Sequence, residues 1–127
     1  MRYLFILFLL GFLSMSNASE QNQDQGLRHV VVFKYKPEAS QQDINKVTNT
    51  LRSLKDKIPG ILRFEYGINN SPEGLDQGFT HVYQFTFVDA AARDHYLPHR
   101  EHAKFGQLLG ELDILESVFV VDYPINE

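Results

Sequence analysis

Residues 95–102 read HYLPHREH and hold three of the five histidines of this 127-residue chain, beside a tyrosine and a glutamate. An imidazole titrates near neutral pH, so histidines that share a pocket with a phenol could carry out general acid–base chemistry. Two neighbouring histidines could also bind a metal ion. In a structural interpretation, each histidine instead hydrogen-bonds to a backbone or carboxylate group and closes the end of a helix. The elements around this stretch decide between these interpretations.

The spacing of the histidines argues against a metal site of the zinc-protease kind. Such a site needs His-Glu-x-x-His on an unbroken helix, but Pro98 lies between His95 and His99 and disfavours helical geometry there. His99 and His102 are three residues apart and could bind a metal weakly, with a third ligand from elsewhere in a chain that lacks cysteine. The chain has no glycine-rich phosphate loop. We therefore predict neither a metal site nor a cofactor.

Hydrophobic periodicity predicts the elements that must position these residues. Stretches rich in β-branched and aromatic residues predict strands, and apolar residues three and four apart predict a helix after Ser40, a favoured N-cap residue. Asp89 is suited to cap a second helix, which Pro98 divides in two. The predicted strands cover residues 28–35, 61–68, 79–88 and 115–123, and the predicted helices cover 41–58, 90–97 and 99 to about 110.

This order of elements predicts an α+β domain of the ferredoxin-like βαββαβ type, with a four-stranded sheet and the helices on one face. We expect the first and third strands to be parallel neighbours at the centre of the sheet. Both faces of the strands are apolar, whereas the helices can cover only one of them. A second copy packed sheet to sheet would cover the other face, so the pattern predicts a homodimer.

His29 and His81 extend the predicted site to the sheet. If their strands are parallel, both histidines lie at the same end of the sheet, on the face that carries Phe33 and Phe85. That face would look toward the broken helix, which predicts an apolar pocket holding several imidazoles and one phenol. The predicted pocket residues are His29, His81, His99, Phe33, Phe85 and Phe105, with Tyr96 and His102 beside them. The pocket is open to a ligand only if the phenylalanines and Leu108 leave space between sheet and helix.

The first 18 residues have the three-part pattern of a secretory signal peptide: Arg2, an apolar run over 3–13, and a small-x-small site that ends at Ala18. The apolar run is too short to span a bilayer comfortably. We expect cleavage after Ala18, a flexible lead-in over 19–27 and one domain over 28–124, exported to the periplasm or secreted. No membrane association is expected after cleavage.

The composition limits the partners of this domain. The formal net charge is −4 at pH 7, so nucleic acids and anionic membranes are poor candidates. We expect a second copy of the chain and a small molecule as partners. Exported small domains usually carry disulfides, but this chain has no cysteine, so its stability must come from packing and from oligomerisation.

Four stretches together resemble a known family across residues 28–124. They are HVVVFKYKPEAS (29–40), LKDKIPGILRFEYGINNSPEGLDQGFTHVYQFTF (54–87), YLPHREHAKF (96–105) and VFVVDY (118–123). The pattern is similar to that of the stress-responsive A/B barrel domain, or Dabb, family. The resemblance implies a ferredoxin-like subunit that pairs into a dimeric α+β barrel, in a family whose members mostly have no settled chemistry.

One plant member of that family is a polyketide cyclase, which performs an aldol condensation with a histidine base and a tyrosine. Its Tyr-x-x-His-x-x-His segment matches Tyr96, His99 and His102, so the resemblance implies His102 as base, Tyr96 as positioning phenol and an aromatic or polyketide-like ligand. Pro98 and the Arg100–Glu101 pair depart from that enzyme. Three functions stay open: a stress-response barrel that binds a small molecule, a cofactor-independent cyclase-like lyase, and a cofactor-independent small monooxygenase.

Overall fold

The computed structural model describes residues 25–127 of the chain. The predicted signal peptide and most of the predicted lead-in lie outside the described residues. Within the described part, no helix is long and apolar enough to cross a membrane.

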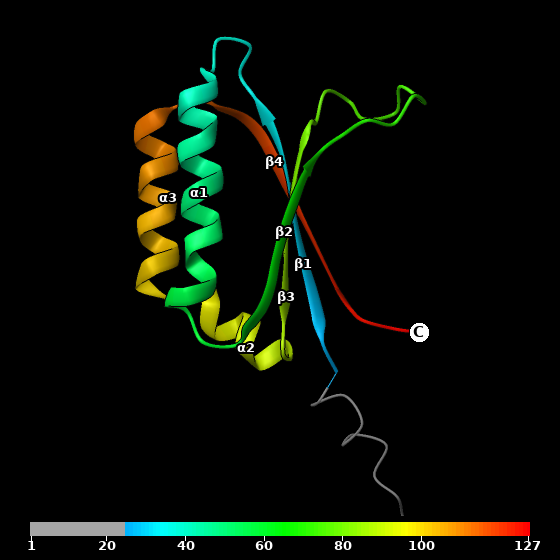
Figure 1. The fold of residues 1–127 in the computed structure, drawn as a ribbon, viewed down its shortest axis with the longest axis vertical. Helices are drawn as coiled ribbons and strands as arrows, with labels where there is room; N and C mark the ends of the chain where they lie inside the picture. Colours follow the sequence, from blue (N-terminus) through cyan, green and yellow to red (C-terminus); the bar gives the residue numbers. More distant parts are fainter. Residues whose placement is uncertain (1–24) are drawn as a thin grey trace, which may run out of the picture.

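Residues 25–127 fold into four strands and three helices in the order β1-α1-β2-β3-α2-α3-β4 (Figure 1). The strands are β1 (Leu27–Tyr35), β2 (Ile61–Ile68), β3 (His81–Phe87) and β4 (Leu115–Pro124). The helices are α1 (Gln41–Lys57), α2 (Ala90–Tyr96) and α3 (Arg100–Leu112). The predicted βαββαβ order and the division of the second helix are confirmed.

The local signals that predicted the helices are the ones that form them. The Ser40 hydroxyl accepts a hydrogen bond from the backbone N–H of Asp43 at 3.1 Å, and the Asp89 carboxylate accepts one from the N–H of Ala92 at 2.8 Å. Such caps satisfy backbone donors that a helix start leaves free. The apolar stripe that α1 forms with its C-cap residue packs on the sheet, and all five of its members are buried: Ile44, Val47, Leu51, Leu54 and Ile58.

The sheet order is β2-β3-β1-β4, and every neighbouring pair is antiparallel. The prediction that the first and third strands are parallel is therefore wrong. The α1 crossover makes β1 and β2 run the same way, but the β2–β3 connection inserts β3 between them in the reverse direction. His29 consequently pairs with Phe85, whereas His81 pairs with Phe33. His81 therefore lies level with Phe33, which is four residues beyond His29 along β1. At the usual rise of a strand, this separates the two histidines by about 13 Å.

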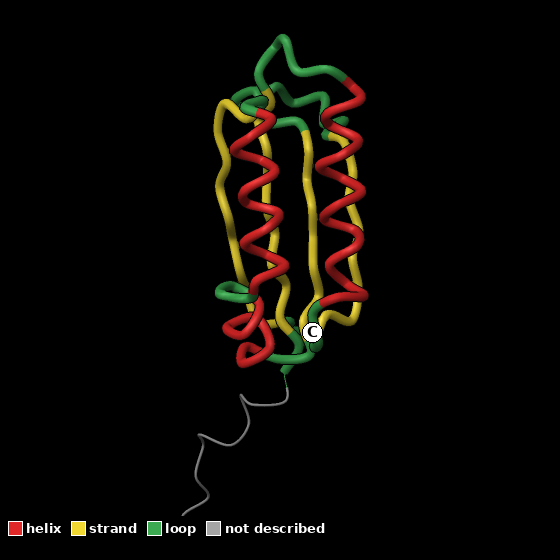
Figure 2. The backbone as a smooth tube through the Cα atoms, turned by 90° about the vertical axis from the view of Figure 1, so that its left-hand side faces the viewer, coloured by secondary structure: helices red, strands yellow, loops and turns green. Residues whose placement is uncertain are grey.

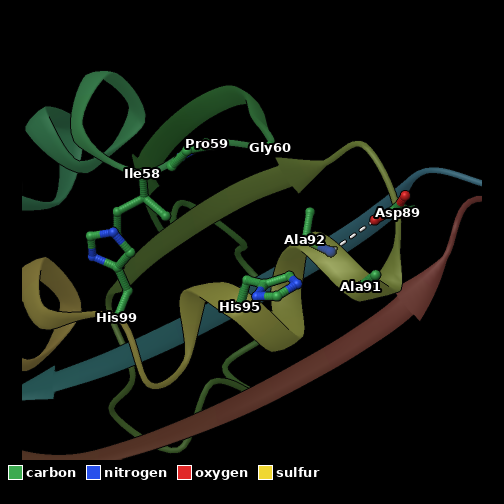
Figure 3. A pocket seen from close by; sticks show the side chains of 8 residues that line it. All are labelled: Ile58, Pro59, Gly60, Asp89, Ala91, Ala92, His95 and His99. Atoms are coloured by element: carbon green, nitrogen blue, oxygen red, sulfur yellow. Dashed lines mark hydrogen bonds between the residues drawn. The ribbon is translucent and has the colours of Figure 1, made fainter.

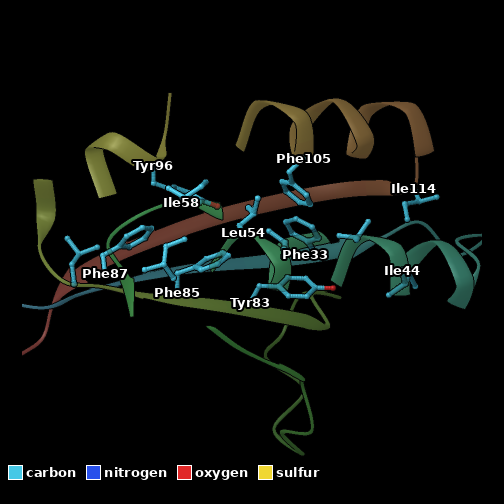
Figure 4. Packing of buried hydrophobic residues seen from close by; sticks show 14 residues of the cluster. Phe33, Ile44, Leu54, Ile58, Tyr83, Phe85, Phe87, Tyr96, Phe105 and Ile114 are labelled. Atoms are coloured by element: carbon cyan, nitrogen blue, oxygen red, sulfur yellow. The ribbon is translucent and has the colours of Figure 1, made fainter. Parts of the chain in front are cut away.

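Both long helices lie on one face of the sheet, as two views at right angles show (Figures 1 and 2). Between these layers is an aromatic core in which Phe33, Tyr83, Phe85, Phe87 and Tyr96 are almost entirely buried (Figure 4). Burial of one such side chain contributes roughly 1.5–3 kcal/mol. Packing alone thus gives this cysteine-free domain a continuous core.

The other face of the sheet is open in the single chain. It presents alternate residues of β4, with Phe119, Val121 and Tyr123 each 44–50% exposed, and these pair with Val32, Val30 and Arg28 of β1. Phe79 adds a ring whose centroid lies 4.9 Å from that of Phe119. The predicted two-sided apolar character of the sheet is confirmed.

Candidate functional site

A cavity of about 570 Å³ lies between α3 and the neighbouring strands β1 and β4. Phe33 and Phe105 are buried yet still line it, so they do not fill the space. Most of its wall is apolar, with Val31, Phe33, Leu51, Phe105, Leu109, Val118 and Val120 among the lining residues. The polar lining side chains are His29, Tyr96, His102 and Asp122. An apolar cavity with a few convergent polar groups is the usual form of a small-molecule site.

His102 reaches this cavity from the first turn of α3. Its Nδ1 lies 2.8 Å from the backbone carbonyl oxygen of Leu97. A carbonyl only accepts, so Nδ1 carries the proton and Nε2 of the neutral ring keeps its lone pair. The fold thus holds His102 in the tautomer of a general base.

Tyr96, the last residue of α2, lies between His102 and His29. Its ring centroid is 4.4 Å from that of His102 and 5.7 Å from that of His29. The residue is 1% exposed, and burial raises its pKa above the ordinary value for tyrosine. Tyr96 therefore stays a neutral phenol that can donate a hydrogen bond, and it is not itself a base.

His29 is buried at the start of β1 and is held by a carboxylate. Its Nδ1 lies 2.7 Å from Oδ1 of Asp122, and Oδ2 of the same carboxylate accepts a 2.6 Å hydrogen bond from Nη1 of Arg93. Burial lowers the pKa of His29, although the Asp122 charge acts in the opposite direction. His29 is thus neutral at neutral pH, with the proton on Nδ1.

His99 does not join these groups, in contrast to its predicted place in the pocket. It is the N-cap of α3, where Nδ1 accepts a 3.1 Å hydrogen bond from the backbone N–H of Glu101. Its side chain lines a separate groove of about 500 Å³, together with His95 and the segment 58–60 (Figure 3). Pro98 is the reason, because the break it makes places His99 before α3 rather than on it.

His81 is also absent from the cavity, because the antiparallel register puts it at the other end of β3 from the His29 level. There its ring packs 4.9 Å from that of Tyr35, and its Nδ1 is 2.8 Å from the Thr80 hydroxyl. Phe85 lies in the core beneath the cavity and touches the rings of His29 and Tyr96 without lining the space. Of the eight predicted site residues, the lining of the cavity includes five: His29, Phe33, Tyr96, His102 and Phe105.

Two charged residues of this region were not predicted from the sequence. Asp122 follows Val118 and Val120 on the helix-facing side of β4, and a carboxylate on an apolar strand face was the signal that could have marked it. Arg93 had no such signal, because only the packing of α2 against the sheet brings it to Asp122. Among residues 25–127, no group of three or more His, Cys, Asp or Glu side chains could hold a metal ion.

The family follows from comparison with known proteins. The profile of the stress-responsive A/B barrel domain, Dabb, matches residues 27–125. The chain belongs to this family. A Dabb relative from Arabidopsis thaliana, the stress-response A/B barrel domain-containing protein HS1, is 32% identical over 98 residues, which are 76% of this chain and 87% of that protein.

Other relatives include two enzymes with different names and one protein of unknown function. Olivetolic acid cyclase of Cannabis sativa is 24% identical over 76% of this chain and 94% of its own length. The solved structure of a hydroxynitrile lyase from Passiflora edulis superposes with a TM-score of 0.73 at 26% identity, over 82% of this chain and 96% of that chain. A dimeric ferredoxin-like protein of unknown function from Jannaschia sp. CCS1 superposes with a TM-score of 0.67 at 26% identity, over 79% and 99% of the two chains. Dabb membership therefore leaves the chemistry of this chain unsettled.

Proposed function

We propose that this Dabb protein binds a small, apolar, uncharged molecule in the cavity beneath α3 and moves a proton on it, with His102 as general base. The observation that carries the proposal is the 2.8 Å hydrogen bond from His102 to the Leu97 carbonyl. It fixes the basic tautomer of a histidine that lines an apolar cavity of about 570 Å³. An imidazole in this state is suited to proton transfer near neutral pH.

The chemistry would be abstraction of a proton from a carbon next to a carbonyl group. Nε2 of His102 accepts the proton, the C–H electron pair forms a carbon–carbon double bond, and the carbonyl electrons move to oxygen. The Tyr96 hydroxyl donates a hydrogen bond to the resulting enolate oxygen, which such a donor stabilises. The imidazolium then returns its proton to the enolate or to a product formed from it. Two relatives, a cyclase and a lyase, are consistent with an acid–base site on this fold.

Hydrogen–deuterium exchange of a benzyl ketone tests the proposal. Phenylacetone in D₂O would be followed by proton NMR, with the wild-type protein and three variants. His102→Gln should lower the protein-catalysed exchange rate by about 10²-fold or more, and Tyr96→Phe should lower it by up to about 10²-fold. His95→Gln is the matched control, because His95 is an exposed histidine of the same segment that lines the separate groove. Exchange equal to that in buffer, or unchanged in His102→Gln, would reject proton transfer by this site.

A binding protein without catalysis is the second candidate, because most of the cavity wall is apolar. In that case phenylacetone would raise the unfolding temperature without exchange. A ligand at about a hundred times its Kd adds ~2.7 kcal/mol to the free energy of unfolding. The small-monooxygenase alternative stays a prediction that no residue of the cavity specifically favours.

We also propose that the chain forms a homodimer through the open face of the sheet. Solved relatives are described as dimeric, and the open face carries the exposed side chains of Phe119, Val121 and Tyr123. An apolar sheet face of this kind marks an interface in a soluble protein. Two-fold packing would cover both open faces at once.

A further inference from the structure

We infer that Asp122 and Arg93 are positioning residues, which make His29 a second proton-accepting imidazole of the cavity beside His102. The inference rests on the proposed function, since a second acceptor matters only if the cavity receives a ligand. Both oxygens of Asp122 are engaged: Oδ1 accepts from His29 at 2.7 Å, and Oδ2 accepts from Arg93 at 2.6 Å.

The hydrogen-bond partners determine which nitrogen of His29 faces a ligand. A carboxylate oxygen that already pairs with a guanidinium accepts and does not donate, so Nδ1 of His29 carries the proton. Nε2 is then left with its lone pair, as it is in His102. The two imidazoles reach the same tautomer through unrelated partners, a carboxylate on β4 and a backbone carbonyl at the end of α2. Tyr96 lies between them.

Arg93 has a separate role from Asp122. An unshared carboxylate beside an imidazole favours the imidazolium, which has no lone pair to offer a ligand. The titratable groups that act on His29 are Asp122 on β4, Arg93 and Tyr96 on α2, and His102 on α3. Arg93 is the permanent cation among them, and it opposes protonation of His29. Asp122 therefore sets the tautomer, and Arg93 adds to burial, which is the larger cause, in keeping the ring neutral.

This arrangement selects the charge of the ligand. The part of the cavity lining that residues 25–127 supply has two acceptor nitrogens and one phenol, and its only charged side chain is Asp122, already paired with Arg93. An uncharged molecule with hydroxyl or enol donors can bond to both imidazoles. A carboxylate would meet two lone pairs and no free cation, so it should be excluded.

Nitrogen NMR of the histidine rings tests the positioning role without any ligand, on the protein labelled with ¹⁵N-histidine. In the wild type, His29 should be neutral at about pH 7 with its proton on Nδ1. Asp122→Asn should move that proton to Nε2, because the carboxamide can donate to Nδ1. Arg93→Gln should keep the tautomer and raise the pKa of His29, while Arg93→Lys should stay close to wild type. Arg100→Gln removes the same charge from an exposed position of α3 and should change neither property.

Three results would overturn the inference: a wild-type His29 with its proton on Nε2, an imidazolium at neutral pH, or a tautomer that Asp122→Asn leaves unchanged in a folded variant. The NMR readout needs no substrate, so the two proposals can fail separately. The tautomers can be as inferred while the protein catalyses no exchange, or the protein can catalyse exchange while His29 has a different tautomer.

A matched pair of probes then tests the charge selection. 4-Propylcatechol, which has two hydroxyl donors, should shift the Nε2 resonances of both His29 and His102, and 4-propylbenzoate should bind at least tenfold more weakly. In Asp122→Asn the shift at His29 should be lost while that at His102 stays. Equal affinity for the benzoate would contradict the selection of uncharged ligands.

Discussion

The carbonyl of Leu97 and the backbone N–H of Glu101 do not bond to each other, because the helix is broken at Pro98. In a continuous helix, residue 101 would donate to residue 97. Here the Leu97 oxygen accepts from Nδ1 of His102 at 2.8 Å, and the Glu101 N–H donates to Nδ1 of His99 at 3.1 Å. Two histidines of HYLPHREH thus replace one backbone bond, one as donor and one as acceptor. The same exchange leaves His102 with its basic nitrogen free.

Removing either histidine should destabilise the domain modestly. His102→Ala and His99→Ala each leave one backbone group to water, at a cost of about 0.5–1.5 kcal/mol, or a fall in Tm of roughly 4–8 °C per kcal/mol for a domain of this size. Thermal unfolding followed by circular dichroism measures this. His99→Ser should recover the loss, because serine is a good N-cap, and His95→Ala should change little. A His99→Ala variant as stable as wild type would show that the cap contributes nothing.

Stability should fall on acidification below about pH 6.5, in part through His29. Burial lowers the pKa of His29 below its ordinary value of 6.5. The unfolded chain therefore takes up the proton first, and the free energy of unfolding decreases as pH falls from about 6.5 to the folded pKa, below which this loss is complete. His29→Gln should make the plot of Tm against pH shallower. Some slope should persist because burial also lowers the pKa of His81; a slope identical to wild type would contradict the depressed pKa of His29.

Two glycines should respond in opposite directions to alanine. Gly60 has φ +89°, and a Cβ there would lie 2.6 Å from the Cβ of Ala92, so Gly60→Ala should destabilise by about 1–3 kcal/mol. Gly110 lies inside α3, and a Cβ there would have no atom within 4 Å apart from its chain neighbours and the backbone of its own helix. Gly110→Ala should therefore stabilise by up to about 1 kcal/mol. Urea unfolding of both variants checks the pair, and a neutral Gly60→Ala would mean that α2 shifts freely away from the turn.

The proposed dimer should dissociate when charge is placed on the open sheet face. Val121 is 50% exposed on that face, and Val121→Lys would bring like charges together across a two-fold axis. Analytical ultracentrifugation should then give the mass of one chain for Val121→Lys and the mass of two chains for the wild type. Leu97→Lys is the control, because Leu97 is 47% exposed but lies on the helix side. A wild-type protein that is monomeric at micromolar concentration would refute the proposed interface.

If residues 1–18 are a signal peptide, the exported protein should lack them. If the full chain is produced with a C-terminal tag in a host with a secretory route, mass spectrometry should find Ser19 as the first residue, since the pattern predicts cleavage after Ala18. Ala18→Tyr should block processing, because the site requires a small residue. Recovery of the unprocessed chain from the cytoplasm would contradict the prediction.

The sequence alone determined the elements of this protein, and the reason is that the signals act locally. Each signal depends on residues that are close together in the sequence. These signals are the strand alternation, the stripe of α1, the caps at Ser40 and Asp89 and the break at Pro98. The family pattern in addition pointed to Tyr96 and His102, which the structure places at one cavity with His29.

Only the tertiary structure decided which residues meet at the site. The direction of β3 depends on long-range pairing. In an antiparallel pair, the start of one strand lies beside the end of the other. His81 therefore lies far from His29, although both were correctly placed on the helix-facing side. The salt bridge from Arg93 to Asp122 joins residues that are 29 positions apart, and no spacing rule connects them. The histidines and the tyrosine of the proposed site could be named from the sequence, whereas the Arg93–Asp122 pair that holds His29 forms only once α2 has packed against the sheet.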